Sequence, residues 1–164
     1  MRGPVEGIPP LLMPVAHALQ QAYEDIGEVL GRLTTDQLWV RPGGAASVGF
    51  HVRHIAGALD RLFTYARGEG LAAAQVQAKA KEEQETGLDP SVLAAEVDKA
   101  MSAAFAQLRA TTADMLLTKR GVGRRQLPSN VLGLLFHAAE HATRHAGQAI
   151  TTAKIVLQLP AHNS

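Results

Sequence analysis

Apolar residues recur at intervals of three and four in four long stretches of the chain, which is the spacing of one buried face on an α-helix. The first stretch runs from Leu11 to Leu33, and the second runs from Val48 to about Ala66. The third runs from Asp89 to about Leu108, and the fourth starts at Ser129 or Asn130 and ends at about Val156. Ser47 directly precedes the second stretch and Asp89 precedes a proline, so both are expected to start helices. The chain is therefore predicted to contain four long helices.

The segments between these stretches have different compositions. Residues 34–47 contain Pro42 and a pair of glycines, which a helix tolerates poorly. Residues 72–86 are rich in Ala, Gln, Lys and Glu, and they fit either a short exposed helix or a mobile loop. Residues 119–130 are rich in Gly and Arg and are expected to be a connection, because the chain shows almost no strand-like alternation. The sequence predicts an all-α protein, an antiparallel four-helix bundle forming a single domain over residues 1–164, in which at least one long connection crosses over.

Composition narrows the class of protein. The chain has 164 residues, 46% of them hydrophobic, which is enough for one core. Sixteen Lys and Arg residues nearly balance fifteen Asp and Glu residues, so nucleic acid is not an expected partner. No run of about 18 apolar residues predicts a membrane span, and the proline-containing N-terminus is a poor secretory signal. The absence of cysteine excludes disulfides, thiolate ligands and a cysteine nucleophile. The expected location is the cytoplasm.

Three histidines lie one helical turn apart in the stretch HAAEHATRHAGQ, at His137, His141 and His145. Side chains four residues apart share a helix face, so two neighbouring imidazoles can bind one metal ion. On a helical wheel His145 lies nearest the apolar stripe, His141 is next, and His137 points most nearly toward solvent. His141 and His145 are therefore the predicted pair. The alternative is that all three are ordinary polar surface residues.

A second pair of histidines, His51 and His54, lies one turn apart on the second predicted helix. Metal sites in helix bundles are built from facing helices, so this pair is expected to supply a third ligand. His51 lies closer to the middle of the apolar stripe, which favours it as the inward group. Periodicity alone leaves the choice between His51 and His54 open, and it leaves open whether His137 contributes.

Two stretches resemble the DinB/YfiT-like family of four-helix-bundle metalloenzymes. The first stretch is residues 33–55, LTTDQLWVRPGGAASVGFHVRHI, which is similar to the family's connection and to the helix that follows it. In the family this helix carries a histidine seven residues after a serine. Counting from Ser47, that histidine is His54. HATRHAGQ is similar to the terminal family motif His-x-x-x-His-Arg-Gly-Gln, which matches His141 and His145. Ala146 stands where the family commonly has arginine.

The resemblance implies an up-down-down-up bundle, often a homodimer, that binds a divalent metal ion, zinc or nickel, through His54, His141 and His145. It also implies that a small-molecule substrate is the partner, with chemistry in which a thiol such as bacillithiol, mycothiol or glutathione is transferred to a small electrophile. No further catalytic or cofactor-binding residue is assigned. The alternatives are a non-catalytic stress-related or structural bundle with a stabilising ion and a metal-dependent hydrolase.

Other residues receive simpler interpretations. Trp39 and Phe50 are expected to be core residues or walls of a pocket, and Glu140 is expected on the surface. Arg120, Arg124 and Arg125 are expected in a solvated loop. The alternative for these arginines is contact with an anionic substrate near the mouth of the bundle.

Overall fold

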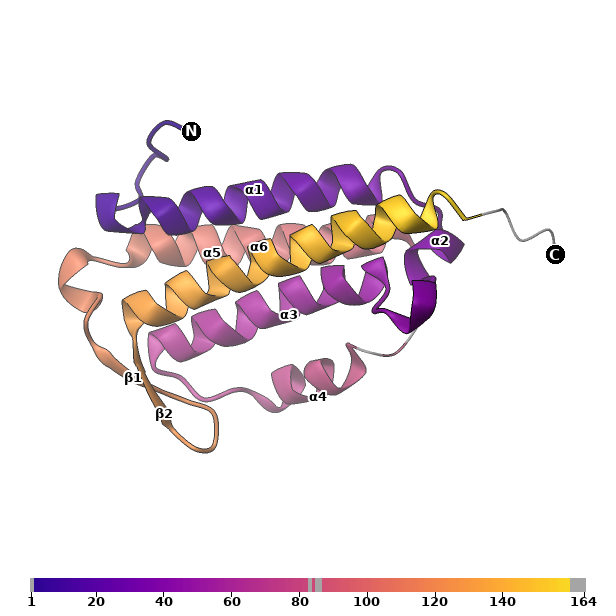
Figure 1. Ribbon diagram of the computed structural model, residues 1–164. Coiled ribbons are helices and arrows are strands. Elements are labelled where there is room, and N and C mark those ends of the chain that lie inside the picture. Colours follow the sequence, from indigo (N-terminus) through magenta and orange to yellow (C-terminus); the bar gives the residue numbers. More distant parts are fainter. Residues whose placement is uncertain (1, 83, 85–86, 160–164) are drawn as a thin grey trace.

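Four long helices make up most of the computed structural model, which describes residues 2–82, 84 and 87–159 (Figure 1). The described chain is mostly helical, so the predicted all-α class is confirmed. None of its helices combines the length and the hydropathy needed to cross a membrane. In chain order the helices are α1 (Met13–Leu30), α2 (Thr35–Trp39), α3 (Val48–Arg67), α4 (Ala73–Lys81), α5 (Pro90–Ala110) and α6 (Val131–Val156), with three short 3-10 turns at Pro10–Leu12, Pro42–Gly44 and Ala113–Met115.

Polar side chains cap the starts of three of the long helices. Ser47 accepts a hydrogen bond from the backbone N–H of Phe50 at the start of α3. Asp89 caps α5, which has Pro90 in its first turn, and Asn130 caps α6. Each of these caps satisfies an N–H group that has no partner inside the helix. The expected starts at Ser47, at Asp89 and at Ser129 or Asn130 are therefore confirmed.

The four long helices enclose one apolar core. Helix α6 packs against both α3 and α1, and each of these also packs against α5. Helices α1 and α6 begin at one end of the molecule, and α3 and α5 begin at the other (Figure 1). The most completely buried large side chains are Leu12, Leu19, Ile26, Leu38, Ile55, Leu59, Leu93, Leu108 and Leu135.

A long connection brings the chain back from the end of α3 to the start of α5. Helix α4 lies within this connection, beside α3 (Figure 1). The indole Nε1 of Trp39 donates to the carbonyl oxygen of Leu88, which fixes the end of the connection near α2. Trp39 is buried, as expected, and its ring lies so close to Gly49 that a Cβ there would be 2.8 Å from a ring carbon. Of the two interpretations of residues 72–86, the helix is correct for Ala73–Lys81, and residues 83, 85 and 86 lie outside the described part.

The connection before α6 differs from the prediction, because it forms a β-hairpin. Strands β1 (Lys119–Val122) and β2 (Leu127–Asn130) pair antiparallel, with Lys119 opposite Asn130 and Val122 opposite Leu127. Each strand has only four residues, which is too short for alternation to be recognised in the sequence. Helix α6 starts directly after β2, so the hairpin is continuous with the helix that carries His141 and His145.

Candidate metal centre

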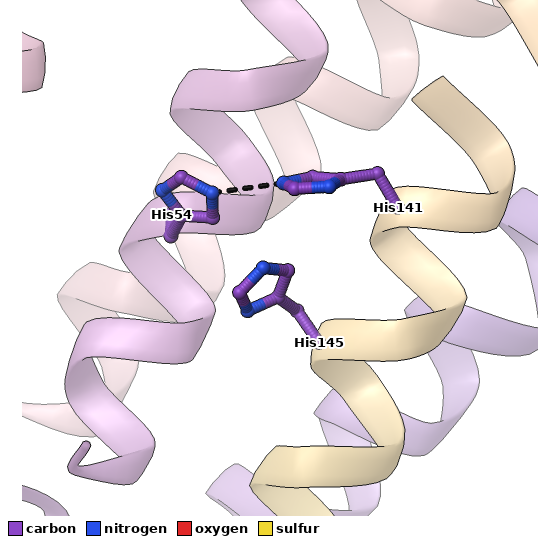
Figure 2. A group of neighbouring side chains, drawn as sticks. All are labelled: His54, His141 and His145. Atoms are coloured by element: carbon purple, nitrogen blue, oxygen red, sulfur yellow. Dashed lines mark hydrogen bonds between the residues drawn. The ribbon is translucent and has the colours of Figure 1, made fainter. Parts of the chain in front are cut away.

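Three histidines from two helices converge in the space between α3 and α6. His54 extends from α3, and His141 and His145 extend from successive turns of α6 (Figure 2). One ring nitrogen of each lies within 4.8 Å of those of the other two, and all three residues are partly buried. The Nε2 atoms of His54 and His141 are 2.8 Å apart. The structure thus brings together the three histidines that the family resemblance selected.

Small buried residues share the turns of α6 that carry two of the histidines. Ala138, Ala142 and Ala146 are buried on the inner face of α6, on the turns that carry His141 and His145. Ala146, the position where the resembling family commonly has arginine, is fully buried. This chain therefore has an apolar packing residue at that position.

His51 lies beside the group of three and contacts one of its members. Its Nδ1 atom is 3.0 Å from Nδ1 of His145, and it is only 5% exposed. The helical wheel was right that His51 points further inward than His54, but it is His54 that joins His141 and His145. His51 is placed to fix the ring orientation of His145.

His137 is mostly exposed and belongs to a different arrangement. Its Nδ1 atom is 2.7 Å from a carboxylate oxygen of Glu140. Both oxygens of this carboxylate also accept a hydrogen bond from Arg144. His137, Glu140 and His141 make a second group whose ligand atoms lie within 4.8 Å of one another. The predicted surface position of Glu140 did not include this group, although a spacing of three residues brings Glu140 and His137 onto one face.

The environment of His141 and His145 favours the neutral forms of their rings. Burial, together with the charge that His54 would carry, lowers the pKa of both His141 and His145 to about 4. Burial also lowers the pKa of His51. The rings of His141 and His145 are therefore unprotonated at neutral pH, and an unprotonated ring nitrogen is the form that binds a metal ion.

Glu82 holds His54 from the side opposite His141. Its carboxylate lies 2.8 Å from Nδ1 of His54 and forms a buried ion pair with Arg61. Burial alone would raise the pKa of the Glu82 carboxyl, but the hydrogen bonds from His54 and Arg61 hold it below its ordinary value. Since Nδ1 of His54 is occupied by Glu82, the Nε2 atom is the one directed at His141. No sequence signal indicated Glu82, because it follows α4 and is 28 positions from His54.

The residues present fit a divalent ion. Two nitrogens bound to one tetrahedral zinc ion at about 2.0–2.1 Å lie roughly 3.3 Å apart, so His54 and His141 need to separate by only about half an ångström. The Nδ1 atom of His141 is buried and has no hydrogen-bond partner among the described residues. The ring of Phe50 stacks on His54 with an interplanar angle of 15°, and it contacts His51 and His145 edge-on. Phe50 is thus a wall of the site, as expected.

A cleft of about 410 Å³ opens beside His54 and His141. Residues from α3, α4, the β-hairpin and α6 line it. Its volume lies in the range of small-molecule sites. The three-histidine group therefore has access to a space that can admit a small substrate.

Comparison with known proteins gives the family of this chain. A conserved protein from Enterococcus faecalis has a crystal structure similar to this one, with a TM-score of 0.73 at 18% identity, covering 90% of this chain and 98% of that chain. At this identity the likeness shows a shared fold. No curated protein matches the chain. Residues 18–149, which include all three histidines of the group, match the DinB superfamily. The chain therefore belongs to the DinB superfamily.

Proposed function

We propose that His54, His141 and His145 bind one divalent metal ion, zinc or nickel, and that the protein transfers a low-molecular-weight thiol to a small electrophile. The observation that carries this proposal is the convergence of three imidazole nitrogens from α3 and α6 within 4.8 Å of one another. Membership of the DinB superfamily supports it. The helix directions in Figure 1 agree with the up-down-down-up order that the resemblance implies, which we include in the proposal.

A divalent ion held by three neutral ligands acts as a Lewis acid and lowers the pKa of a group bound at its open position. The chain's own residues supply orientation and shielding. Glu82 accepts the Nδ1–H of His54, which directs Nε2 inward, and Phe50 covers one side of the same ring. The cleft beside His54 and His141 provides the space for the two reactants. The chain contains no cysteine, so the thiol must come from a separate molecule.

Metal-dependent hydrolysis is a second candidate, favoured by one observation. The Glu140 carboxylate belongs to the group that includes His141, which places a general base next to one proposed ligand. This carboxylate is also bound by Arg144 and His137, and both contacts reduce its basicity. Thiol transfer therefore remains the first candidate.

Metal content tests the ligand assignment. The untagged protein would be compared by elemental analysis with the variants His54→Ala, His141→Ala and His145→Ala. His17→Ala is the matched control, because His17 lies on α1 and is bonded to the Gly3 carbonyl. We expect one ion per chain in the parent and in His17→Ala, and loss of metal in the other three. Equal metal content in all five proteins would refute the assignment.

Activity is tested separately, by metal-dependent consumption of thiols in the presence of electrophiles and by hydrolysis of ester and amide substrates. We expect thiol consumption that is abolished by chelation and restored by added metal. Specific metal binding without turnover of any substrate would favour a stabilising ion over an enzyme.

A further inference from the structure

The cleft beside His54 and His141 is lined by acidic or basic side chains of one sign only. Its charged side chains are Arg61, Lys79, Arg124 and Arg125, and no Asp or Glu is among the described residues that line it. The chain as a whole is almost neutral, with a formal net charge of +1. The lining of this cleft therefore carries a local excess of positive charge that the chain as a whole does not have.

Three of these four cations have no acidic partner there. Arg61 is neutralised by its buried ion pair with Glu82. Lys79, Arg124 and Arg125 form no ion pair within the part of the chain that the structure describes. A divalent ion bound by three neutral imidazoles would add two more positive charges at the inner end of the same cleft. Like charges at close range are unfavourable, so an arrangement of this kind is complementary to an anionic ligand.

The two arginines are presented by a well-defined turn. They occupy the middle of the hairpin, between Gly123 and Gln126, both of which have positive φ values. The backbone N–H and the side-chain amide of Gln126 both donate to the Gly123 carbonyl. At Gly121 a Cβ would lie 2.2 Å from the side-chain oxygen of Gln126, so this glycine leaves room for the side chain that closes the turn.

The hairpin is also tied to the body of the protein. Arg120 Nε donates to the carbonyl of Ala66 at the end of α3, at 2.8 Å. The expectation of a solvated loop for Arg120 is therefore wrong, because this side chain is a structural anchor. With the hairpin anchored, Arg124 and Arg125 are held at the edge of the cleft.

The rest of the cleft surface is apolar. Leu62, Leu71, Val122 and Leu127 line the same cleft as the histidines and the basic side chains. A ligand that fits this combination of side chains carries a metal-binding group, a short apolar segment and an anionic group.

We infer that Arg124, Arg125 and Lys79 form an anion-binding subsite for the carboxylate or phosphate group of the small molecule that reacts at the three-histidine site. This inference rests on the proposed function and deepens it, because it assigns the class of the co-substrate. Guanidinium groups bind carboxylates and phosphates through paired hydrogen bonds, and these are stronger than hydrogen bonds between neutral groups.

Thiol binding to the cobalt-substituted protein tests the inference. Two probes of similar size would be titrated, 3-mercaptopropionate and the uncharged 2-mercaptoethanol, with the thiolate-to-cobalt absorption band as the readout. The proteins would be the parent, Arg124→Ala/Arg125→Ala, and Lys79→Ala. The control Arg32→Ala/Lys154→Ala also removes two positive charges, from a pair that lines a separate cavity between α1 and the end of α6.

We expect the parent to bind 3-mercaptopropionate about tenfold more tightly than 2-mercaptoethanol, which corresponds to one charge-assisted hydrogen bond. The double arginine variant should lose most of this preference, Lys79→Ala should lose part of it, and the control should keep it. Affinity for 2-mercaptoethanol should be the same in all four proteins. The preference should also weaken as the salt concentration rises.

Failure of the subsite and failure of the metal site give different results. Cobalt content would be measured in every sample before titration. Loss of cobalt binding in the parent would refute the proposed function. Normal cobalt content with equal affinities for the two thiols, or with a preference that survives in the double arginine variant, would overturn the subsite alone. Normal cobalt content with no binding of either thiol would overturn the subsite and thiol transfer together, and would leave only the metal site standing.

Discussion

Nδ1 of His54 lies 2.8 Å from a carboxylate oxygen of Glu82, so a residue at the end of α4 fixes the ring of a proposed metal ligand on α3. Histidines that bind metals usually donate their second N–H to a carboxylate or carbonyl, which sets the tautomer and the ring orientation. The same carboxylate is held by Arg61, so Glu82 cannot rotate away from His54 without breaking a buried ion pair.

Replacement of Glu82 should weaken metal binding without removing a ligand. In Glu82→Ala we expect metal affinity to fall by roughly 10- to 100-fold, because the His54 ring loses its orienting partner. Glu82→Gln should recover part of the loss, since its amide oxygen can still accept from Nδ1. Competition with a chromophoric chelator measures both affinities on folded protein.

Arg61→Gln is the matched control for these variants. It breaks the same ion pair but leaves the Glu82 carboxylate beside His54. We expect a loss of about 3–5 kcal/mol in the free energy of unfolding, as for other broken buried pairs, with a smaller effect on metal affinity than Glu82→Ala has. Metal affinity in Glu82→Ala equal to that of the parent would contradict the positioning role.

Gly57→Ala should perturb the metal centre through the Arg61–Glu82 ion pair, without replacing a histidine. A Cβ at Gly57 would lie 2.2 Å from a carboxylate oxygen of Glu82 and 2.8 Å from Nη1 of Arg61, so the ion pair must move. We expect reduced metal affinity, measured by the same chelator competition. The control is Gly27→Ala on α1, where nothing lies within 4 Å of the new Cβ. That change should stabilise the protein by roughly 0.5–1 kcal/mol and leave metal affinity unaltered. Equal metal affinities in the two glycine variants would argue against the role of this contact.

His137→Ala distinguishes the two groups that share His141. If the ion is held by His54, His141 and His145, removal of the exposed His137 should leave the metal content at the parent level. His145→Ala should lose the ion in the same assay. The reverse result, with loss in His137→Ala and retention in His145→Ala, would place the ion with His137 and Glu140.

The metal-free protein should lose stability in mildly acidic solution. His141 and His145 have pKa values of about 4 in the folded protein, whereas an unfolded histidine has a pKa near 6.5. Between these values the unfolded chain binds more protons, so their contribution to stability is fully present above about pH 6.5 and is lost as the pH falls toward 4. Urea unfolding with a chelator present, at several pH values in this window, measures the slope. A double variant, His141→Gln/His145→Gln, should show a flatter dependence, and equal slopes would count against this explanation.

The long helices were predictable because their signals are local. The apolar spacing is a property of each helical stretch itself. The capping residues directly precede the helices that they start, at Ser47, Asp89 and Asn130. The pairing of His141 with His145 is equally local, because it depends on one helical turn.

The rest of the site depends on contacts between segments that are distant in the chain. The wheel correctly ranked His51 as more buried than His54, but burial does not decide which ring joins a group on another helix. Glu82 was missed because its partners, His54 and Arg61, lie on α3, far from it in the sequence. The contacts form only because the connection after α3 folds back beside that helix. The hairpin was missed because each of its strands has only four residues, which is too short for alternation to be recognised.

The connection between α3 and α5 contributes Lys79 to the cleft and Glu82 to His54, yet neither side chain belongs to the apolar core. Such a segment can exchange residues, or change in length, at little cost to the packing of the long helices. Substitutions in this connection can therefore change which ion and which ligand are bound in different relatives. The long helices that carry the imidazoles can stay the same.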